Sequence, residues 1–119
     1  MIDPLKRLPA VFYATAVGNE PVKDWLRSLG VTDRKTASVA IATVEYGWPV
    51  GMPVCRGIGN GFWEVRVAFR DGRIGRILWC EHKGTMVLLH AFEKTTQKLP
   101  AAEKDVAIGR LKDLRRRSP

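Results

Sequence analysis

The chain has 119 residues, 27% of them charged and 45% hydrophobic, so we expect one folded domain over residues 1–119 with a modest core. Its net charge of +8 favours a polyanionic partner, either nucleic acid or an acidic protein. No apolar run approaches the roughly 20 residues that cross a bilayer, and the first residues lack the apolar segment of a secretory signal. We therefore expect a cytoplasmic protein, in which Cys55 and Cys80 are reduced thiols without a metal-binding or redox spacing.

A short strand and an amphipathic helix are predicted near the N-terminus. Residues 11–14 (Val-Phe-Tyr-Ala) are typical of a strand. Asn19 is predicted to cap a helix that has Pro21 in its first turn, where the missing N–H costs little, and that ends at Gly30. Apolar residues repeat at helical spacing on one side of this helix: Val22, Trp25, Leu26 and Leu29.

A second helix and an irregular stretch are predicted next. Thr32 is expected to cap this helix, and Gly47 and Pro49 to end it. The glycine-rich residues 49–61 predict an irregular connection that is too short to be a domain linker. The apolar line of the helix is formed by Ala37, Ile41 and Val44.

Three adjacent strands follow. They cover residues 62–69, 75–79 and 86–94, which are rich in β-branched, aromatic and other apolar residues. Asp-Gly at 71–72 and Lys-Gly at 83–84 are short turn signals between them, so we expect an antiparallel meander.

The first of these strands has two chemically different faces. Alternation sends Glu64, Arg66 and Arg70 to one face. A carboxylate and guanidinium groups on rigid backbone are what a site that handles phosphodiesters needs. The opposite face is apolar and must be buried, and it receives Trp63, Val65, Val67 and Phe69.

Pro100 is predicted to start a last helix, followed by a frayed tail at 115–119. Gly109 lies inside this helix, at a cost of about 1 kcal/mol against alanine. The predicted order is β-α-α-β-β-β-α, an α+β domain with an antiparallel sheet, two helices packed on one face and a C-terminal helix. The apolar side of the last helix is formed by Ala107, Leu111 and Leu114.

Three motifs taken together resemble the HigB branch of the RelE/ParE toxin superfamily. They are Phe62-Trp63-Glu64-Val65-Arg66, then Gly75-Arg76-Ile77-Leu78-Trp79, then Leu-Leu-His-Ala-Phe-Glu-Lys-Thr-Thr-Gln-Lys-Leu-Pro over 88–100. Each motif is short, and their order and spacing make the resemblance specific; it extends over almost the whole chain. It implies a RelE-like fold and a ribosome-dependent endoribonuclease that inhibits translation, neutralised by a helix-turn-helix antitoxin of the HigA type.

The chain departs from the pattern of that branch at three positions. Gly75 stands where an aromatic residue usually precedes the arginine, Thr95 replaces the second lysine of a pair, and Leu99 replaces a threonine. We expect Gly75 to loosen the packing beside Arg76, and Thr95 to remove one phosphate contact. An inactive or altered toxin therefore stays open as an interpretation.

RNA cleavage of the implied kind uses the 2′-hydroxyl group as the nucleophile and needs no metal. It requires a base, cations that stabilise the extra negative charge, and an acid for the leaving 5′-oxygen. The sequence has two histidines, no His-x-x-x-His motif and no carboxylate cluster, so we expect no metal and no other cofactor.

Five residues are candidates for catalysis. Arg66 and Arg76 are expected to stabilise charge, since arginine stays protonated and its planar fork fits phosphate oxygens; their truncation should leave the fold intact. Lys94 would hold the scissile phosphate or transfer a proton, although its sequence neighbours supply no apolar burial to lower its pKa far. Glu64 would act as the base or only orient Arg66. His90 has an ordinary pKa of about 6.5, suitable for a base, but a lone histidine on an apolar strand is more often a hydrogen-bonded core residue.

Three further residues are candidates for RNA binding. Arg70 and Lys98 are expected to contact the RNA backbone, and Phe92 to stack on an unpaired base. Trp79 has apolar neighbours and is expected in the core.

A second interpretation of the chain is a RelE/ParE-fold module that acts by binding alone. It would be a toxin directed at gyrase or an inactive prophage remnant. Gyrase-directed relatives tend to lack the Glu-x-Arg, Arg-Ile and Phe-x-Lys set as a group, and its presence here favours the nuclease. A short helix-turn-helix reading frame beside the gene would favour the toxin.

Overall fold

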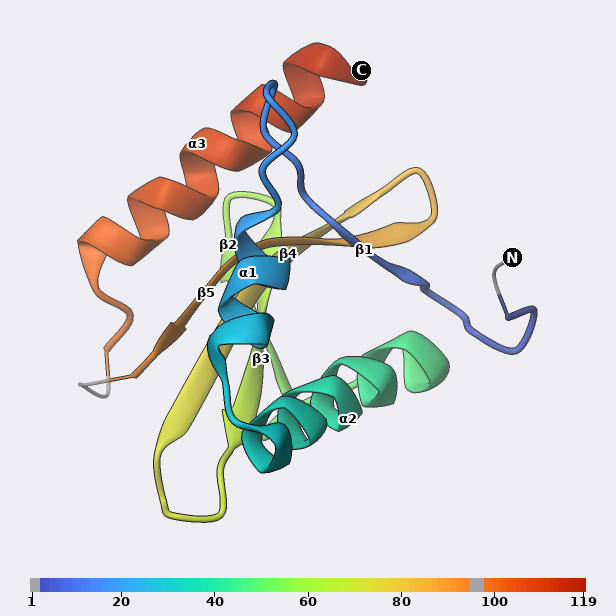
Figure 1. The fold of residues 1–119 in the computed structure, drawn as a ribbon. Coiled ribbons are helices and arrows are strands. Elements are labelled where there is room, and N and C mark those ends of the chain that lie inside the picture. The colour runs from blue at the N-terminus through green and yellow to red at the C-terminus, as the bar shows by residue number, and fades with distance from the viewer. Residues whose placement is uncertain (1–2, 95–97) are drawn as a thin grey trace.

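A computed structural model describes residues 3–94 and 98–119 (Figure 1). The α+β class is confirmed, with one strand more than the sequence predicts. None of the described helices is both long and apolar enough to cross a membrane. Thr95 lies outside the described residues. The elements are β1 (Ala10–Phe12), α1 (Pro21–Ser28), α2 (Val31–Gly47), β2 (Cys55–Gly59), β3 (Phe62–Ala68), β4 (Ile74–His82), β5 (Thr85–Glu93) and α3 (Ala101–Arg117).

The strands form one mixed sheet in the order β1-β5-β4-β3-β2. β3, β4 and β5 make the predicted antiparallel meander. β1 instead pairs in parallel with β5, Val11 lying opposite Val87, so the prediction of an antiparallel sheet is wrong at this edge. Parallel strands need a long crossover, and here two helices and three strands separate the partners along the chain.

The buried carboxylate of Glu45 on α2 holds β1 in place. The backbone carbonyl of Glu45 accepts the N–H groups of Arg7 and Leu8 at 2.8 and 3.0 Å. Its carboxylate accepts the N–H of Ala10 at 2.7 Å and pairs with Lys6 at 2.9 Å. The parallel pairing of β1 thus depends on Glu45 of α2, and the three residues of β1 alone do not indicate this pairing.

β2 lies where the sequence predicts an irregular connection. Asn60 and Gly61 join it to β3 with φ values of 56° and 86°, the left-handed values that a two-residue hairpin turn needs. Asn-Gly between apolar segments is a strong hairpin signal. The glycines within β2 weaken the strand pattern beside it, so the hairpin was not predicted. The register shifts between Gly57 and Gly59, so the strand is also irregular.

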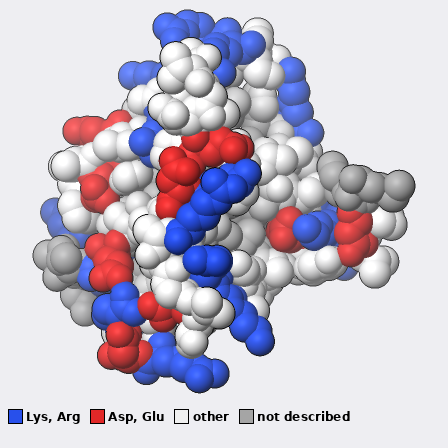
Figure 2. All heavy atoms as spheres, viewed as in Figure 1, with Lys and Arg blue, Asp and Glu red and all other residues white. Residues whose placement is uncertain are grey.

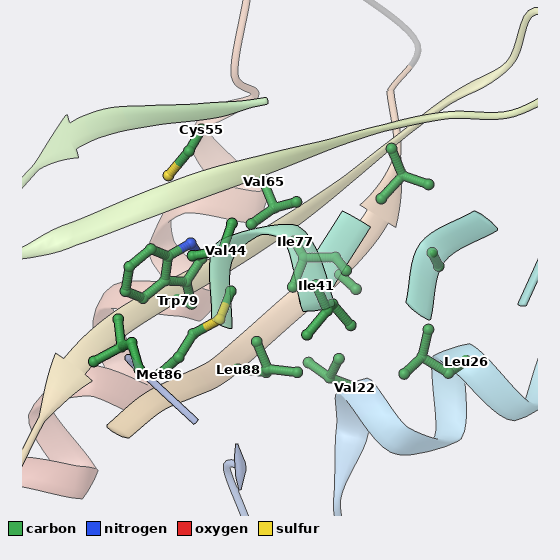
Figure 3. Packing of buried hydrophobic residues seen from close by; sticks show 14 of the residues in the cluster. Val22, Leu26, Ile41, Val44, Cys55, Val65, Ile77, Trp79, Met86 and Leu88 are labelled. Carbon is green, nitrogen blue, oxygen red and sulfur yellow. The ribbon is translucent and has the colours of Figure 1, made fainter. Parts of the chain in front are cut away.

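Helices cover both faces of the sheet, and each face has its own hydrophobic cluster. The predicted alternation in β3 is confirmed, because Val65 and Val67 join the α1–α2 cluster whereas Phe62 joins the α3 cluster. Trp79 is fully buried, as expected. Figure 3 shows side chains of the first cluster meeting between the helices and the sheet: Val22 and Leu26 of α1, Ile41 and Val44 of α2, and Ile77, Trp79 and Leu88 of the sheet.

Both predicted helix caps are displaced by one or two residues. The N-cap of α1 is Glu20, because Asn19 closes a turn with Thr15 through two hydrogen bonds of 2.8 and 3.1 Å. The N-cap of α2 is Gly30 in place of Thr32, since only two residues separate the helices. The position of Pro21 in the first turn is confirmed.

The predicted frayed tail is helical as far as Arg117. Tyr13, just after β1, donates its hydroxyl to Asp113 of α3 at 2.5 Å. Arg117 donates to the carbonyl of Ala14 at 2.6 Å and to Asp113 at 2.7 Å. These contacts stabilise the end of α3 against the segment that follows β1.

Gly75 does not loosen the packing beside Arg76. A Cβ atom at Gly75 would lie 3.0 Å from Phe69 and 3.2 Å from Trp25, so these two rings fill the space that an aromatic side chain would take. The departure from the family pattern at this position is compensated by residues elsewhere in the chain.

We expect Gly109→Ala to raise the free energy of unfolding by about 1 kcal/mol in urea denaturation. Gly109 is exposed inside α3, and no atom lies within 4 Å of where its Cβ would be. Gly72→Ala is the matched control, because it meets equally open space but has a φ of 90°. That substitution should destabilise the protein by about 1 kcal/mol. Similar effects of both substitutions would contradict this account.

Candidate functional site

The polar face of β3 opens into a cleft of about 240 Å³. Alternation from Phe62 places Glu64 and Arg66 on the side of the sheet that α3 covers. Four of the predicted catalytic residues line this cleft: Glu64, Arg66, Arg76 and Lys94. The remaining lining consists of Met52, Pro53, Val54 and Arg56.

Strand register brings the charged residues together. Arg56 of β2 lies opposite Glu64 of β3, and Arg66 of β3 lies opposite Arg76 of β4. Lys94 follows β5 directly, and its N–H donates to the carbonyl of Ile74 at 2.7 Å. Four neighbouring strands therefore contribute to the cleft, on hydrogen-bonded backbone that fixes their side chains in space.

Glu64 forms ion pairs across the sheet, and its side chain is almost fully buried. Its Oε2 accepts Nη1 of Arg76 at 3.1 Å and lies 3.5 Å from Nη2 of Arg56. The sequence leaves two roles open for Glu64, as a base or as a residue that only orients Arg66, two residues along the same strand. Residues two apart lie about 6.6 Å from each other along a strand, whereas cross-strand neighbours are about 5 Å apart, so the cross-strand partners are favoured.

Arg76 is more buried than the sequence predicts, with 5% of its surface exposed. Its truncation would leave the buried Glu64 without the nearer of its two guanidinium partners. Loss of one partner from a buried ion pair typically costs about 3–5 kcal/mol. We therefore expect removal of Arg76 to destabilise the fold, contrary to the prediction from the sequence, whereas Arg66 is exposed and keeps that prediction.

Lys94 is half-buried among the cations of the cleft. Partial removal from water lowers the pKa of Lys94, and repulsion from Arg76 and Arg66 lowers this pKa further. Glu64 acts in the opposite direction. The repelling arginines belong to other strands, so the sequence next to Lys94 does not reveal them.

His90 does not line the cleft, because α3 engages both of its ring nitrogens. Nε2 lies 3.1 Å from Glu103, and Nδ1 lies 3.2 Å from Nη1 of Arg110. Since the guanidinium group can only donate, Nδ1 accepts and the proton resides on Nε2. Burial lowers the pKa of His90, with Glu103 partly opposing this. The structure thus places His90 as a hydrogen-bonded residue between the sheet and α3.

The three predicted RNA-binding residues do not line this cleft. Phe92 is half-buried and stacks on His90, with ring centroids 5.6 Å apart. β3 ends at Ala68, so alternation does not reach Arg70, which borders a hollow against α2 on the other side of the sheet. Lys98 lines a separate hollow beside β2. RNA contacts by these residues remain predictions.

Arg56 is a fourth basic residue of the cleft, and the sequence did not predict it. Arg56 lies on β2, the strand concealed by glycines, and the Asn60-Gly61 turn is the signal that reveals this strand. Once β2 pairs with β3, Arg56 is opposite Glu64 and shares the polar face. Met52 is the other missed feature, an exposed apolar side chain at the rim.

The cleft concentrates positive charge, since four basic side chains and one carboxylate line it. On the face drawn in Figure 2, basic and acidic side chains instead lie interspersed. A concave site with such an excess attracts anions, and guanidinium groups suit phosphate oxygens in particular.

Other common catalytic groups are not assembled in the described parts of the chain. Within residues 3–94 and 98–119, no three His, Cys, Asp or Glu side chains are placed to hold a metal ion. Burial raises the pKa of both Cys55 and Cys80 to about 11, so both are protonated at neutral pH. Neither cysteine lines the cleft.

Comparison with known proteins gives one family match. The family described as "Phage derived protein Gp49-like (DUF891)" matches residues 24–112. The match includes every residue that lines the cleft. This family is of the RelE/HigB toxin type in general and is associated with toxin–antitoxin systems. No curated protein matches the chain.

We expect wild type to lose stability as the pH falls from about 6.5, where unfolded histidine titrates, through the lowered pKa of His90. The unfolded chain then binds a proton that the folded chain binds less well, whereas above this range the stabilisation is complete. His90→Gln keeps an N–H donor for Glu103 and does not titrate. In urea denaturation between pH 7.5 and 5, the stability of the variant should fall less than that of wild type. Parallel profiles would contradict the neutral state of His90.

Proposed function

Because the chain belongs to the Gp49-like family of phage-derived proteins, we propose that it is the toxin of a type II toxin–antitoxin system, an endoribonuclease that cleaves mRNA on the ribosome. The observation that carries this proposal is the cleft, which is lined by four basic side chains and one buried carboxylate that pairs with two of them. Such a site is complementary to a phosphodiester whose negative charge increases during the reaction.

In this reaction the 2′-hydroxyl oxygen attacks the adjacent phosphorus atom, and the bond to the 5′-oxygen of the next nucleotide breaks. Arg66, Arg76 and Lys94 bind the non-bridging oxygens, which gain charge as the new bond forms. Glu64 is a positioning residue in this scheme, since its carboxylate is paired with Arg76 and Arg56. The products are a 2′,3′-cyclic phosphate and a 5′-hydroxyl group.

The shortage of proton-transfer groups in the cleft supports the proposed dependence on the ribosome. The arginines that line the cleft cannot exchange protons, and the Glu64 carboxylate is paired with Arg76 and Arg56, which leaves Lys94, whose pKa is lowered, as the remaining candidate in the cleft. We infer that the ribosome orients the mRNA and supplements proton transfer. The partner that neutralises the chain is a HigA-like helix-turn-helix antitoxin, whose binding covers part of the +8 charge.

Expression of the chain alone should arrest growth, and co-expression of the adjacent helix-turn-helix gene should relieve the arrest. Mapping of mRNA 5′ ends after induction is the measurement, with Arg66→Ala as the inactive control. New 5′-hydroxyl ends within translated codons are expected for wild type only. Arrest without new ends would support a toxin that acts by binding, whereas normal growth with abundant folded protein would contradict the toxin and support an inactive remnant.

Arg66→Ala should reduce cleavage on the order of 100-fold, about 3 kcal/mol, through loss of one cationic contact to the transition state. Because Arg66 is exposed, the free energy of unfolding should change by less than about 0.5 kcal/mol. The assay is single-turnover cleavage of mRNA on stalled ribosomes. Arg27→Ala on α1, which is exposed and does not line the cleft, is the matched control. Equal rates for Arg66→Ala and Arg27→Ala would place the chemistry elsewhere.

Two substitutions of Lys94 separate its possible roles. Lys94→Ala should be nearly inactive, and Lys94→Arg should keep part of the activity, because a clamp tolerates another permanent cation. Arginine cannot exchange protons in the working pH range, so a proton-transfer role does not survive this change. Both variants are compared with wild type across pH in the same single-turnover assay. Equal inactivation of both, with ribosome binding unchanged, would indicate proton transfer by Lys94.

A further inference from the structure

A second hollow lies beside the cleft, and Arg56 lines both. It has a volume of about 370 Å³ and is bordered by β2, by residues 98–99 and by the first turn of α3. The two hollows are therefore adjacent, and Arg56 lies at the boundary that they share. The lining of the second hollow consists of Arg56, Gly57, Ile58, Lys98, Leu99 and Lys104.

The residues that line this second hollow include three basic side chains and no carboxylate, so its charge is positive. Glu103, the acidic neighbour of Lys104 in α3, is engaged by His90 on the sheet side of the helix. Ile58 and Leu99 supply apolar surface between the cations. Basic side chains beside apolar surface suit a chain of phosphates that carries sugars and bases.

We propose that the second hollow binds the backbone of the single-stranded RNA next to the scissile phosphate, so that the site spans several nucleotides. This inference rests on the proposed function, because it extends the substrate from the cleft along β2. Arg56 would contact the RNA between the two hollows, and Lys98 and Lys104 would contact phosphates further along. The second hollow contributes affinity and direction to the bound strand, whereas the chemistry stays in the cleft.

The test measures the Kd of 2′-O-methyl oligouridines by fluorescence anisotropy over a range of salt concentrations. These oligonucleotides cannot be cleaved by 2′-hydroxyl attack. A 3-mer occupies the cleft alone, and a 9-mer reaches both hollows. Each phosphate contact on a single strand adds roughly 0.7 to the slope of log Kd against log salt. Lys98→Gln/Lys104→Gln should reduce the slope for the 9-mer by about 1.4 and leave the 3-mer unchanged. Lys104→Gln alone should give about half of this change.

Lys23→Gln/Lys112→Gln is the control, because it removes the same charge and neither lysine lines either hollow. Three results would overturn the inference: equal slopes for the 3-mer and the 9-mer in wild type, equal effects of the two double variants, or displacement of the 9-mer by a nine-residue glutamate peptide at equal concentration. The last result would indicate a general polyanion surface or a site for an acidic protein segment.

Failure of the proposed function gives a different pattern. In that case wild type produces no new mRNA ends in cells, yet the 9-mer still binds with the steeper slope and the lysine variants still reduce it. Failure of the further inference alone leaves cleavage intact and removes the dependence of the slope on oligonucleotide length.

Discussion

The ion pairs of Glu64 are the interaction on which the cleft depends. Taking a guanidinium group out of water costs several kcal/mol unless an opposite charge accompanies it. Arg76 is almost fully buried, and the Glu64 carboxylate, equally buried, offsets that cost. The same oxygen also faces Arg56, so one carboxylate holds guanidinium groups from two different strands. Without it, the cations of the cleft would repel one another and turn toward solvent.

Helix α3 covers only part of its side of the sheet. The covered part is a hydrophobic cluster, and the uncovered part is polar. Leu78, Leu89 and Phe62 lie in the cluster that Ala107 and Leu111 of α3 cover. The same strands continue beyond that cluster, and there they present Arg66 and Arg76 to the cleft. A rigid, half-covered sheet thus supplies both the fold's second core and a preorganised arrangement of charge. Because the polar residues belong to the same strands as the core residues, their spacing is fixed by the core packing.

Local patterns in the sequence were sufficient for much of this structure. Alternation in β3 and the Asp71-Gly72 and Lys83-Gly84 turns predicted the meander, and alternation placed Glu64 and Arg66 on one polar face. Helical spacing predicted which sides of α1, α2 and α3 are buried. These features depend on neighbours a few residues apart, where backbone geometry determines side-chain direction.

Features that depend on distant contacts could not be predicted in this way. The parallel pairing of β1 depends on Glu45, and the partners of Glu64 depend on cross-strand register. Arg56 was missed because recognising β2 requires giving the Asn60-Gly61 turn more weight than the glycines beside it. His90 illustrates the opposite case, since its burial against α3 agrees with the ordinary expectation for a histidine on an apolar strand.

The contact between Tyr13 and Asp113 joins residues 100 positions apart in the chain, and this separation has a consequence for synthesis. Contacts between distant residues form late in folding, because a long loop must close first. A nascent chain emerges from its N-terminus, so β1 has no strand to pair with until β5 is exposed, and Tyr13 has no partner until α3 follows. The cleft likewise needs Lys94, which follows β5. Folding of the complete domain therefore comes after translation of its last helix, and under the proposed function, action on translating ribosomes, this order separates the synthesis of the protein from its activity.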